Sequence, residues 1–218
     1  MTAVVAVVGG PGSGKSTLCA ALAERFRGEG LVVDHFREEE ILSRADFAQV
    51  ASQFAGGAGS VAPRTLVEDY RGYVSRAVTD GVDLLITDAL VPFIPSLIAW
   101  GHSEAELARV IGDLEDVAAG VTVVVVMLTA DPAITLQRAI SREGEGWAES
   151  YIRKLSRLPG TSHVVSIPTA VDQLRRDADI TRRLLARSKW RLVEVDATAE
   201  ARSMADSVVR RLTAILAG

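Results

Sequence analysis

The stretch that decides the fold of this chain is Gly9-Gly10-Pro11-Gly12-Ser13-Gly14-Lys15-Ser16-Thr17. Before it, residues 3–8 are alanine and valine, as is typical of a buried strand, and after it residues 18–26 are mostly good helix formers. Glycines let the backbone bend so that successive N–H groups point inward, and a helix N-terminus adds positive potential. A strand, a glycine-rich loop and a helix in this order therefore predict a binding site for the phosphates of a nucleotide.

The spacing G-x-x-x-x-G-K-S within this stretch is that of a P-loop. Lys15 is expected to reach the β- and γ-phosphates, and the Ser16 hydroxyl to bind Mg²⁺. The alternative is a glycine-rich turn with an incidental lysine, which the flanking strand and helix disfavour. We therefore predict that the chain binds ATP with Mg²⁺ through Gly10, Pro11, Gly12, Ser13, Gly14, Lys15, Ser16 and Thr17.

The composition fits one α/β domain, residues 1–218, with 48% hydrophobic residues to form its core. A net charge of −4 argues against a general nucleic-acid binder, which would carry a basic surface. No run of about 20 apolar residues predicts a membrane span. The single cysteine, Cys19, fits a reducing compartment, and the apolar start is interpreted as a strand rather than a signal peptide, so we expect a cytoplasmic protein.

Strand-like and helix-like segments alternate along the chain. Strands are predicted at 3–8, 31–36, 82–88, 121–128 and 191–196, and helices at 16–27, 41–50, 63–80, 103–119, from 132 onward, 169–188 and 199–216. Pro92 and Pro95 are expected to keep their segment irregular. This alternation predicts a doubly wound, mostly parallel sheet with helices on both faces, a three-layer sandwich whose ligands bind at the carboxyl ends of the strands.

Asp88 closes an apolar strand, as the Mg²⁺-binding aspartate of a P-loop protein does. The alternative is an ordinary aspartate in the turn after a strand. A hydrolytic ATPase usually carries a second acid at the next position, where this chain has Ala89, and the Asn-Lys-x-Asp motif of a GTPase is absent. Both features favour transfer of a phosphoryl group to an acceptor over hydrolysis.

Arginines gather in the stretch after Asp131-Pro132. Arg138 and Arg142 are four residues apart and share a helix face, and Arg153 and Arg157 repeat this spacing. Arginine forks stabilise the charge that spreads over the oxygens of a transferring phosphoryl group. We therefore predict a lid-like segment at about 142–160. The alternative, which the arginine chemistry disfavours, is a solvated helix face on which the glutamates of this region form salt bridges.

Together, the P-loop GGPGSGKST, the D-P-x-x-x-L-x-R-x-x-x-R stretch and the final strand and helix resemble the P-loop small-molecule kinases, most of all the thymidylate kinase and deoxynucleoside kinase group. The resemblance implies strand order 2-3-1-4-5 and a helical lid whose arginines match Arg138 and Arg142. Arg37-Glu38 resembles the Arg-Glu that follows strand 2 in thymidylate kinases, and Asp69-Tyr70-Arg71 lies where these families carry a substrate-binding arginine. One departure is Asp88-Ala89, because the group usually has Asp-Arg or Glu-Arg there.

The acceptor side of the site carries both signs of charge. A hydroxyl acceptor benefits from a carboxylate base, which Glu38 or Glu39 would provide, whereas a phosphate acceptor needs arginines. The candidate residues for binding the acceptor are Arg37, Glu38, Glu39, Arg64, Arg71 and Asp88, with Glu38 as the catalytic carboxylate.

We thus predict an ATP-dependent phosphotransferase that acts on a small molecule, first of all a nucleoside or nucleoside monophosphate. The alternatives are a kinase for a sugar or an antibiotic, and a nucleotide-switched regulatory ATPase. No nucleic-acid or membrane partner is expected. The run from Leu90 to Pro95 is predicted to be exposed, as a homodimer interface or as a wall of the acceptor site.

Overall fold

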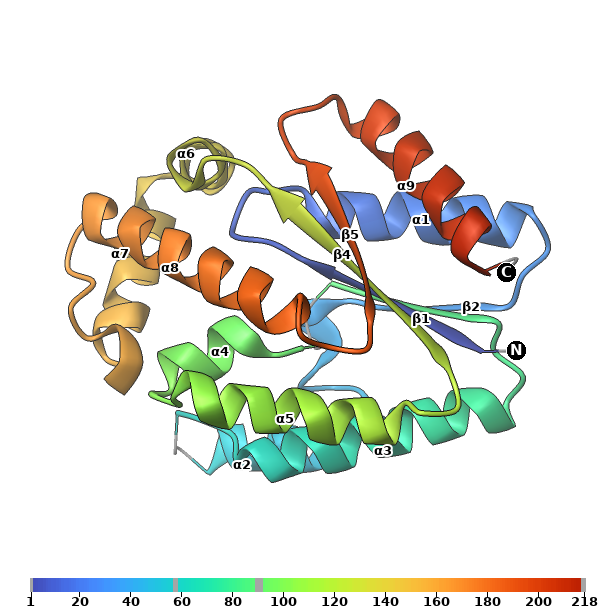
Figure 1. Cartoon of the computed structure of the whole chain (residues 1–218). Coiled ribbons are helices and arrows are strands. Elements are labelled where there is room, and N and C mark those ends of the chain that lie inside the picture. Colours follow the sequence, from blue (N-terminus) through green and yellow to red (C-terminus); the bar gives the residue numbers. More distant parts are fainter. Residues whose placement is uncertain (1, 57–58, 89–91, 217–218) are drawn as a thin grey trace.

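A five-stranded parallel sheet lies at the centre of the structure (Figure 1). The computed structural model describes residues 2–56, 59–88 and 92–216. The strands follow the order β2-β3-β1-β4-β5, as the resemblance implied. Their bounds are β1 Ala3–Val8, β2 Val33–Phe36, β3 Leu84–Thr87, β4 Thr122–Thr129 and β5 Arg191–Asp196.

Helices cover both faces of this sheet, which gives the three layers of the predicted sandwich (Figure 1). Helices α1 and α9 pack on one face, and α3 and α5 pack on the other. The helices are α1 Lys15–Gly28, α2 Ala48–Ala55, α3 Pro63–Thr79, α4 Ile94–Ala99, α5 Glu104–Val117, α6 Pro132–Glu143, α7 Glu145–Ser156, α8 Ile167–Leu185 and α9 Ala201–Leu216, with short 3₁₀ turns η1 Glu38–Glu40, η2 Ala45–Phe47 and η3 Pro159–Thr161.

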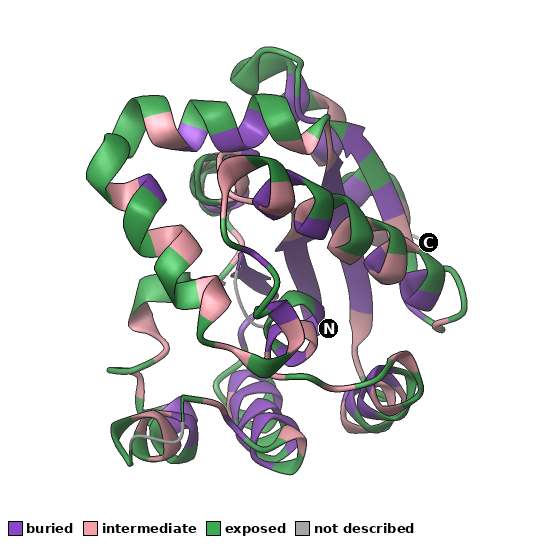
Figure 2. Cartoon of the chain, turned by 90° about the vertical axis from the view of Figure 1, so that its left-hand side faces the viewer, coloured by how far each residue is buried: buried purple, intermediate pink, exposed green. Residues whose placement is uncertain are grey.

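The alternation of side chains along β1 explains why the sheet has a core on each face. Val5 and Val7 pack towards α1 and α9, whereas Val4 and Ala6 pack towards α3 and α5. All four are almost completely buried. Figure 2, which faces the carboxyl ends of the strands, shows buried residues on the sheet and on the inner sides of the helices. A continuous apolar strand is therefore what this position in the sheet requires.

Three local predictions are corrected by the structure. The predicted helix over 41–50 begins only at Ala48, because two short 3₁₀ turns, at 38–40 and 45–47, take its place, and Arg44 between them pairs with Glu40 and Asp46. The segment around Pro95 is helical as α4, since a proline in the first turn of a helix does not lose a hydrogen bond there. Leu90 and Val91 lie outside the described residues; Pro92, Phe93 and Ile94 are buried and Pro95 is exposed, so the predicted exposure is wrong for the first three of these four residues.

The predicted starts of the helices at 103 and 132 are confirmed to within a residue. The Asp131 side chain accepts a 3.0 Å hydrogen bond from the Ala133 N–H and so caps α6, and Ser103 and Glu106 form a capping box at the start of α5. Within the described part of the chain, no helix is long and apolar enough to cross a bilayer.

Candidate active site

The P-loop connects β1 to α1 at the carboxyl edge of the sheet. Gly12 and Gly14 have φ angles of +72° and +91°, a conformation that favours glycine. The first N–H groups of α1 have no partner within the helix, and its first turn contains no acidic residue. Lys15 Nζ donates a 3.4 Å hydrogen bond to the carbonyl of Gly10, so the ammonium folds back over the loop. This arrangement is suited to binding an anion.

Helix α6 packs directly against the P-loop at Gly12. A Cβ atom at this position would lie 1.9 Å from the carbonyl oxygen of Thr135 and 2.9 Å from the nitrogen of Ala139. Only glycine allows the backbones of the loop and the helix to come this close. The glycine therefore fixes α6, with Arg138 and Arg142 on it, next to the phosphate-binding loop.

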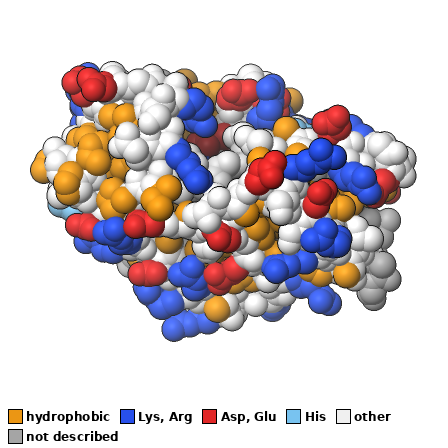
Figure 3. All heavy atoms as spheres, turned by 90° about the horizontal axis from the view of Figure 1, so that it is seen from above, with side chains coloured by type: hydrophobic (Ala, Val, Ile, Leu, Met, Phe, Trp, Pro, Cys, Tyr) orange, Lys and Arg blue, Asp and Glu red, His pale blue; other side chains and the backbone are white. Residues whose placement is uncertain are grey.

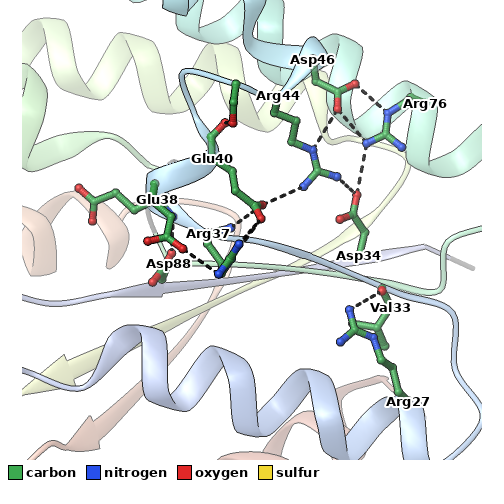
Figure 4. A network of polar contacts seen from close by, with 12 residues as sticks. Arg27, Val33, Asp34, Arg37, Glu38, Glu40, Arg44, Asp46, Arg76 and Asp88 are labelled. Atoms are coloured by element: carbon green, nitrogen blue, oxygen red, sulfur yellow. Dashed lines mark hydrogen bonds and ion pairs between the residues drawn. The ribbon is translucent and has the colours of Figure 1, made fainter.

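Asp88 follows β3, which lies beside β1 in the sheet, and its side chain is 3% exposed. Its Oδ1 accepts a 2.9 Å hydrogen bond from the backbone N–H of Glu38 (Figure 4). This bond joins the ends of β2 and β3. It brings residues 37–40, which carry the predicted acceptor-binding groups, to the aspartate predicted to bind the metal.

The oxygen atoms of Ser16 and Asp88 fit a magnesium ion whose other ligands are waters and substrate phosphates. Ser16 has an exposed side chain in the first turn of α1, and Asp88 offers a carboxylate at the end of the neighbouring strand. Among the described residues, no group of three or more His, Cys, Asp or Glu side chains could hold a metal ion. Mg²⁺ is usually held by one or two protein oxygens together with waters and substrate phosphates, so Ser16 and Asp88 would be sufficient.

Two titratable side chains lie behind the site in protonation states that add no charge to it. Burial, and then the nearby Asp88 carboxylate, raise the pKa of the Cys19 thiol, although Lys15 acts against this shift. Burial lowers the pKa of His35, so its ring is neutral at pH 7. The His35 Nε2 atom is enclosed and has no hydrogen-bond partner among the described residues. A neutral thiol and a neutral imidazole leave Asp88 and Lys15 as the main charges here.

On the acceptor side, Arg37 is already paired with carboxylates of its own segment. Its guanidinium lies 2.7 Å from Glu39 and 2.8 Å from Glu40. Burial alone would raise the pKa of Glu40, but the hydrogen bonds from Arg37 outweigh it and the pKa is lowered. The exposed Glu38 carboxylate, in contrast, pairs with none of the residues that the structure describes. The backbone of Glu38 is therefore fixed by Asp88, while its carboxylate has no partner among the described residues.

Arg64 and Arg71 lie on the outward face of α3, opposite its buried face. The Arg64 side chain is 88% exposed and pairs with Glu68 at 2.7 Å, one turn along the same helix. Asp69, from the same stretch, is buried and accepts a hydrogen bond from the N–H of Val50. The structure thus brings Arg37, Glu38 and Asp88 together but does not bring Arg64 and Arg71 to them.

The predicted arginine side of the site lies on α6. The Arg138 guanidinium donates a 2.8 Å hydrogen bond to the carbonyl of Ala197, in the loop between β5 and α9, and Arg142 pairs with Glu143. Both side chains line one hollow on the surface of α6. Seen from the side of α1, α6 and α9, basic and acidic side chains are interspersed (Figure 3).

Helix α7 forms most of the segment that was predicted to be lid-like. Its Arg153 and Arg157 are exposed, while Trp147 and Tyr151 stack at 5.0 Å between ring centroids. A separate apolar cluster joins α7 to α6 and α8. The segment is therefore a helix with its own small core.

Sequence reasoning did not find the charge cluster beside β2. Asp34, Arg44, Asp46 and Arg76 come from β2, the 3₁₀ turns and α3, and they form ion pairs with one another. No sequence spacing predicts this cluster, because its members lie up to 42 positions apart.

Neither a family model nor a curated protein sequence matches the chain. Among solved structures, it is similar to deoxyadenosine kinase from M. mycoides with bound dATP. The TM-score is 0.53 at 12% sequence identity, over 96% of this chain and 99% of that chain. At such low identity the likeness shows the fold alone, and this fold is that of a P-loop kinase of the deoxynucleoside kinase type.

Proposed function

We propose that the chain is an ATP-dependent phosphotransferase that moves the γ-phosphoryl group to a hydroxyl of a small molecule. A nucleoside is the first candidate, since the similar solved structure is a deoxyadenosine kinase with bound dATP. The observation that carries the proposal is the hydrogen bond between Glu38 N–H and Asp88, because it holds the backbone of Glu38 at the end of β3, the strand next to β1 and its P-loop.

A hydroxyl acceptor is favoured over a phosphate acceptor by the charges of the acceptor side. Arg37 is neutralised by Glu39 and Glu40, and Arg64 by Glu68. A phosphate acceptor would have to displace these carboxylates before it could bind the guanidinium groups. A neutral hydroxyl requires a base and no cation, and Glu38 meets that requirement.

In the proposed reaction, the acceptor oxygen attacks the γ-phosphorus, and the bond from this phosphorus to the β–γ bridging oxygen breaks. The Glu38 carboxylate takes the proton of the attacking hydroxyl, and ADP leaves with the bridging oxygen. Lys15, Arg138 and Arg142 stabilise the charge on the phosphoryl oxygens. Mg²⁺, held by Ser16 and Asp88, would neutralise charge on the β- and γ-phosphates.

The test is a screen of acceptors in which ADP release and the phosphorylated product are both measured. Nucleosides, nucleoside monophosphates, sugars and hydroxylated antibiotics are compared at equal concentration. We expect turnover with at least one hydroxyl acceptor and none with Lys15→Ala, whose circular dichroism should remain that of a folded protein. Turnover with monophosphates only would contradict the hydroxyl assignment. Slow ADP release that no acceptor accelerates would instead favour a nucleotide-switched regulatory ATPase.

A further inference from the structure

The charge cluster beside β2 has Arg44 at its centre (Figure 4). The Arg44 guanidinium pairs with Asp34 of β2, lies 3.3 Å from Asp46 of η2 and 3.8 Å from Glu40 of η1. Its side chain is 20% exposed, and those of Asp34 and Asp46 are 16% and 12% exposed. Screening by solvent is therefore weaker here than for the surface pairs of the chain.

Aromatic rings form the floor under this guanidinium. The carbon at the centre of the Arg44 fork lies 4.7 Å from the ring centroid of Phe36 and 5.1 Å from that of Tyr73. A planar guanidinium can stack on such rings while its edges bind carboxylates, which an ammonium cannot do. The position of Arg44 is thus set by the two rings, which contact the face of its guanidinium, and by three carboxylates, which pair with its nitrogen atoms.

A second arginine shares two of these carboxylates but has a different third partner. Arg76 of α3 lies 3.2 Å from Asp34 and 2.7 Å from Asp46, and its remaining pair is with Asp80 on its own helix. Its guanidinium is also near the Tyr73 ring, at 5.7 Å. Of the two arginines, Arg44 is the one whose ion pairs include Glu40.

Glu40 is what connects the cluster to the site. Its carboxylate accepts hydrogen bonds from the backbone N–H of Arg37 at 3.3 Å and from the Arg37 guanidinium at 3.1 and 2.8 Å. Glu38, the residue after Arg37, donates a backbone hydrogen bond to Asp88. A line of contacts therefore runs from α3 through Arg44 and Glu40 to the segment that holds the proposed base.

We infer that Arg44 is a positioning residue, which holds residues 37–40 in the place where Glu38 can act on the acceptor hydroxyl. The inference rests on the proposed function for its kinetic consequence, but its structural consequence does not depend on any activity. The ion pair with Glu40 and the stacking on Phe36 of β2 and Tyr73 of α3 carry it, because they join the segment to the sheet and to α3 at once.

The experiment compares Arg44→Gln with Arg76→Gln, which removes a guanidinium from the same cluster but leaves the contact between Arg44 and Glu40. The first measurement is hydrogen exchange at the amides of Glu38 and Glu40, which needs no substrate. We expect exchange at least tenfold faster in Arg44→Gln and within twofold of wild type in Arg76→Gln, at a temperature where both variants are folded. Equal acceleration in both variants, or none in Arg44→Gln, would overturn the inference.

The second measurement is kinetic. For the acceptor found in the screen, Arg44→Gln should lower kcat/KM by tenfold or more and leave the dissociation constant for ATP within twofold of wild type, with partial recovery in Arg44→Lys. Arg76→Gln should lower the melting temperature but change acceptor kcat/KM less than twofold. A loss of kcat/KM that follows the melting temperature in both variants would mean a structural role only. If wild type uses no acceptor, the proposed function fails while the exchange result still decides the role of Arg44.

Discussion

The backbone N–H of Glu38 and the Oδ1 atom of Asp88 are joined by a 2.9 Å hydrogen bond that links the ends of strands β2 and β3. Asp88 is thereby shared between two parts of the site. Its carboxylate is proposed to bind Mg²⁺ beside the P-loop, and it also fixes the backbone of Glu38 in the segment proposed to bind the acceptor. Any change at one of these parts is expected to reach the other through this bond.

The first prediction concerns the choice between two neighbouring carboxylates. Glu38→Gln removes the proposed base, so kcat should fall by about 10²- to 10⁴-fold, the usual range for general base catalysis. Glu39→Gln is the matched control, because the Glu39 side chain is 71% exposed and pairs with Arg37. Steady-state kinetics with the screened acceptor measure both variants. A larger loss in Glu39→Gln would assign the base to that residue instead.

The second prediction concerns the close approach of α6 to the P-loop. Gly12→Ala would place a Cβ atom 1.9 Å from the Thr135 carbonyl oxygen, at a residue with φ +72°, so we expect loss of ATP binding and a lower melting temperature. Gly72→Ala, in the interior of α3 with no atom within 4 Å of the new Cβ, should instead stabilise the protein by about 0.5–1 kcal/mol. Nucleotide titration and thermal unfolding measure the two effects. Tight ATP binding by Gly12→Ala would contradict the assigned geometry.

The third prediction separates transition-state stabilisation from ground-state binding at Arg138. Arg138→Ala should lower kcat by about 10²-fold or more, with a modest change in KM, since the guanidinium is proposed to act on the transferring phosphoryl group. Arg183→Ala is the control: this half-exposed arginine pairs with Glu104 and joins α8 to α5. An effect of Arg138→Ala on KM alone would mean that Arg138 contributes to binding of ATP and not to stabilising the transition state.

The fold could be predicted from the sequence because its signals are local and repeated. The apolar run at residues 3–8 and the alternating charged and apolar residues at 191–196 predicted two strands to the residue, and Asp131 precedes the start of α6. The strand order came from the resemblance, and the sheet confirms it. The P-loop residues could likewise be proposed from the motif and its flanking strand and helix, because the motif lies within nine consecutive positions.

The acceptor side could not be predicted in the same way, because long-range contacts decide it. Arg64 and Arg71 were acceptor candidates as arginines of the predicted helix, Arg71 also by the resemblance, but the phase of α3 turns them outward, and Arg64 pairs with Glu68 one turn away. The charge cluster around Arg44 joins β2, η2 and α3. Its members are far apart in sequence, so their ion pairs could not be predicted from spacing. Ion pairs of this kind depend on how the helices and strands are placed against one another, which the hydrophobic periodicity of the sequence does not predict.

Asp177, a half-buried carboxyl group, lies on α8, away from the candidate site. Asp177 of α8 accepts a 2.7 Å hydrogen bond from the side-chain amide of Gln173 and lies close to Tyr151 of α7. Burial raises the pKa of Asp177 from 3.8 to about 6, although the bond from Gln173 and the charge of Arg176 act against this shift. The charged form is thus disfavoured in the folded protein.

The last prediction is the pH dependence that follows from this carboxyl group. Between about pH 4 and pH 6 the folded protein holds a proton on Asp177 that the unfolded chain has released, so the contribution of this group to the free energy of unfolding decreases as pH rises through that window. A shift of about two units corresponds to at most about 3 kcal/mol. Asp177→Asn should therefore be close to wild type at pH 4 and melt several degrees higher at pH 7, whereas Asp172→Asn, at an exposed position of the same helix, should show no such divergence. Thermal unfolding across pH 4–7.5 measures this difference, and parallel curves for wild type and Asp177→Asn would show that Asp177 is ionised in the fold at little cost.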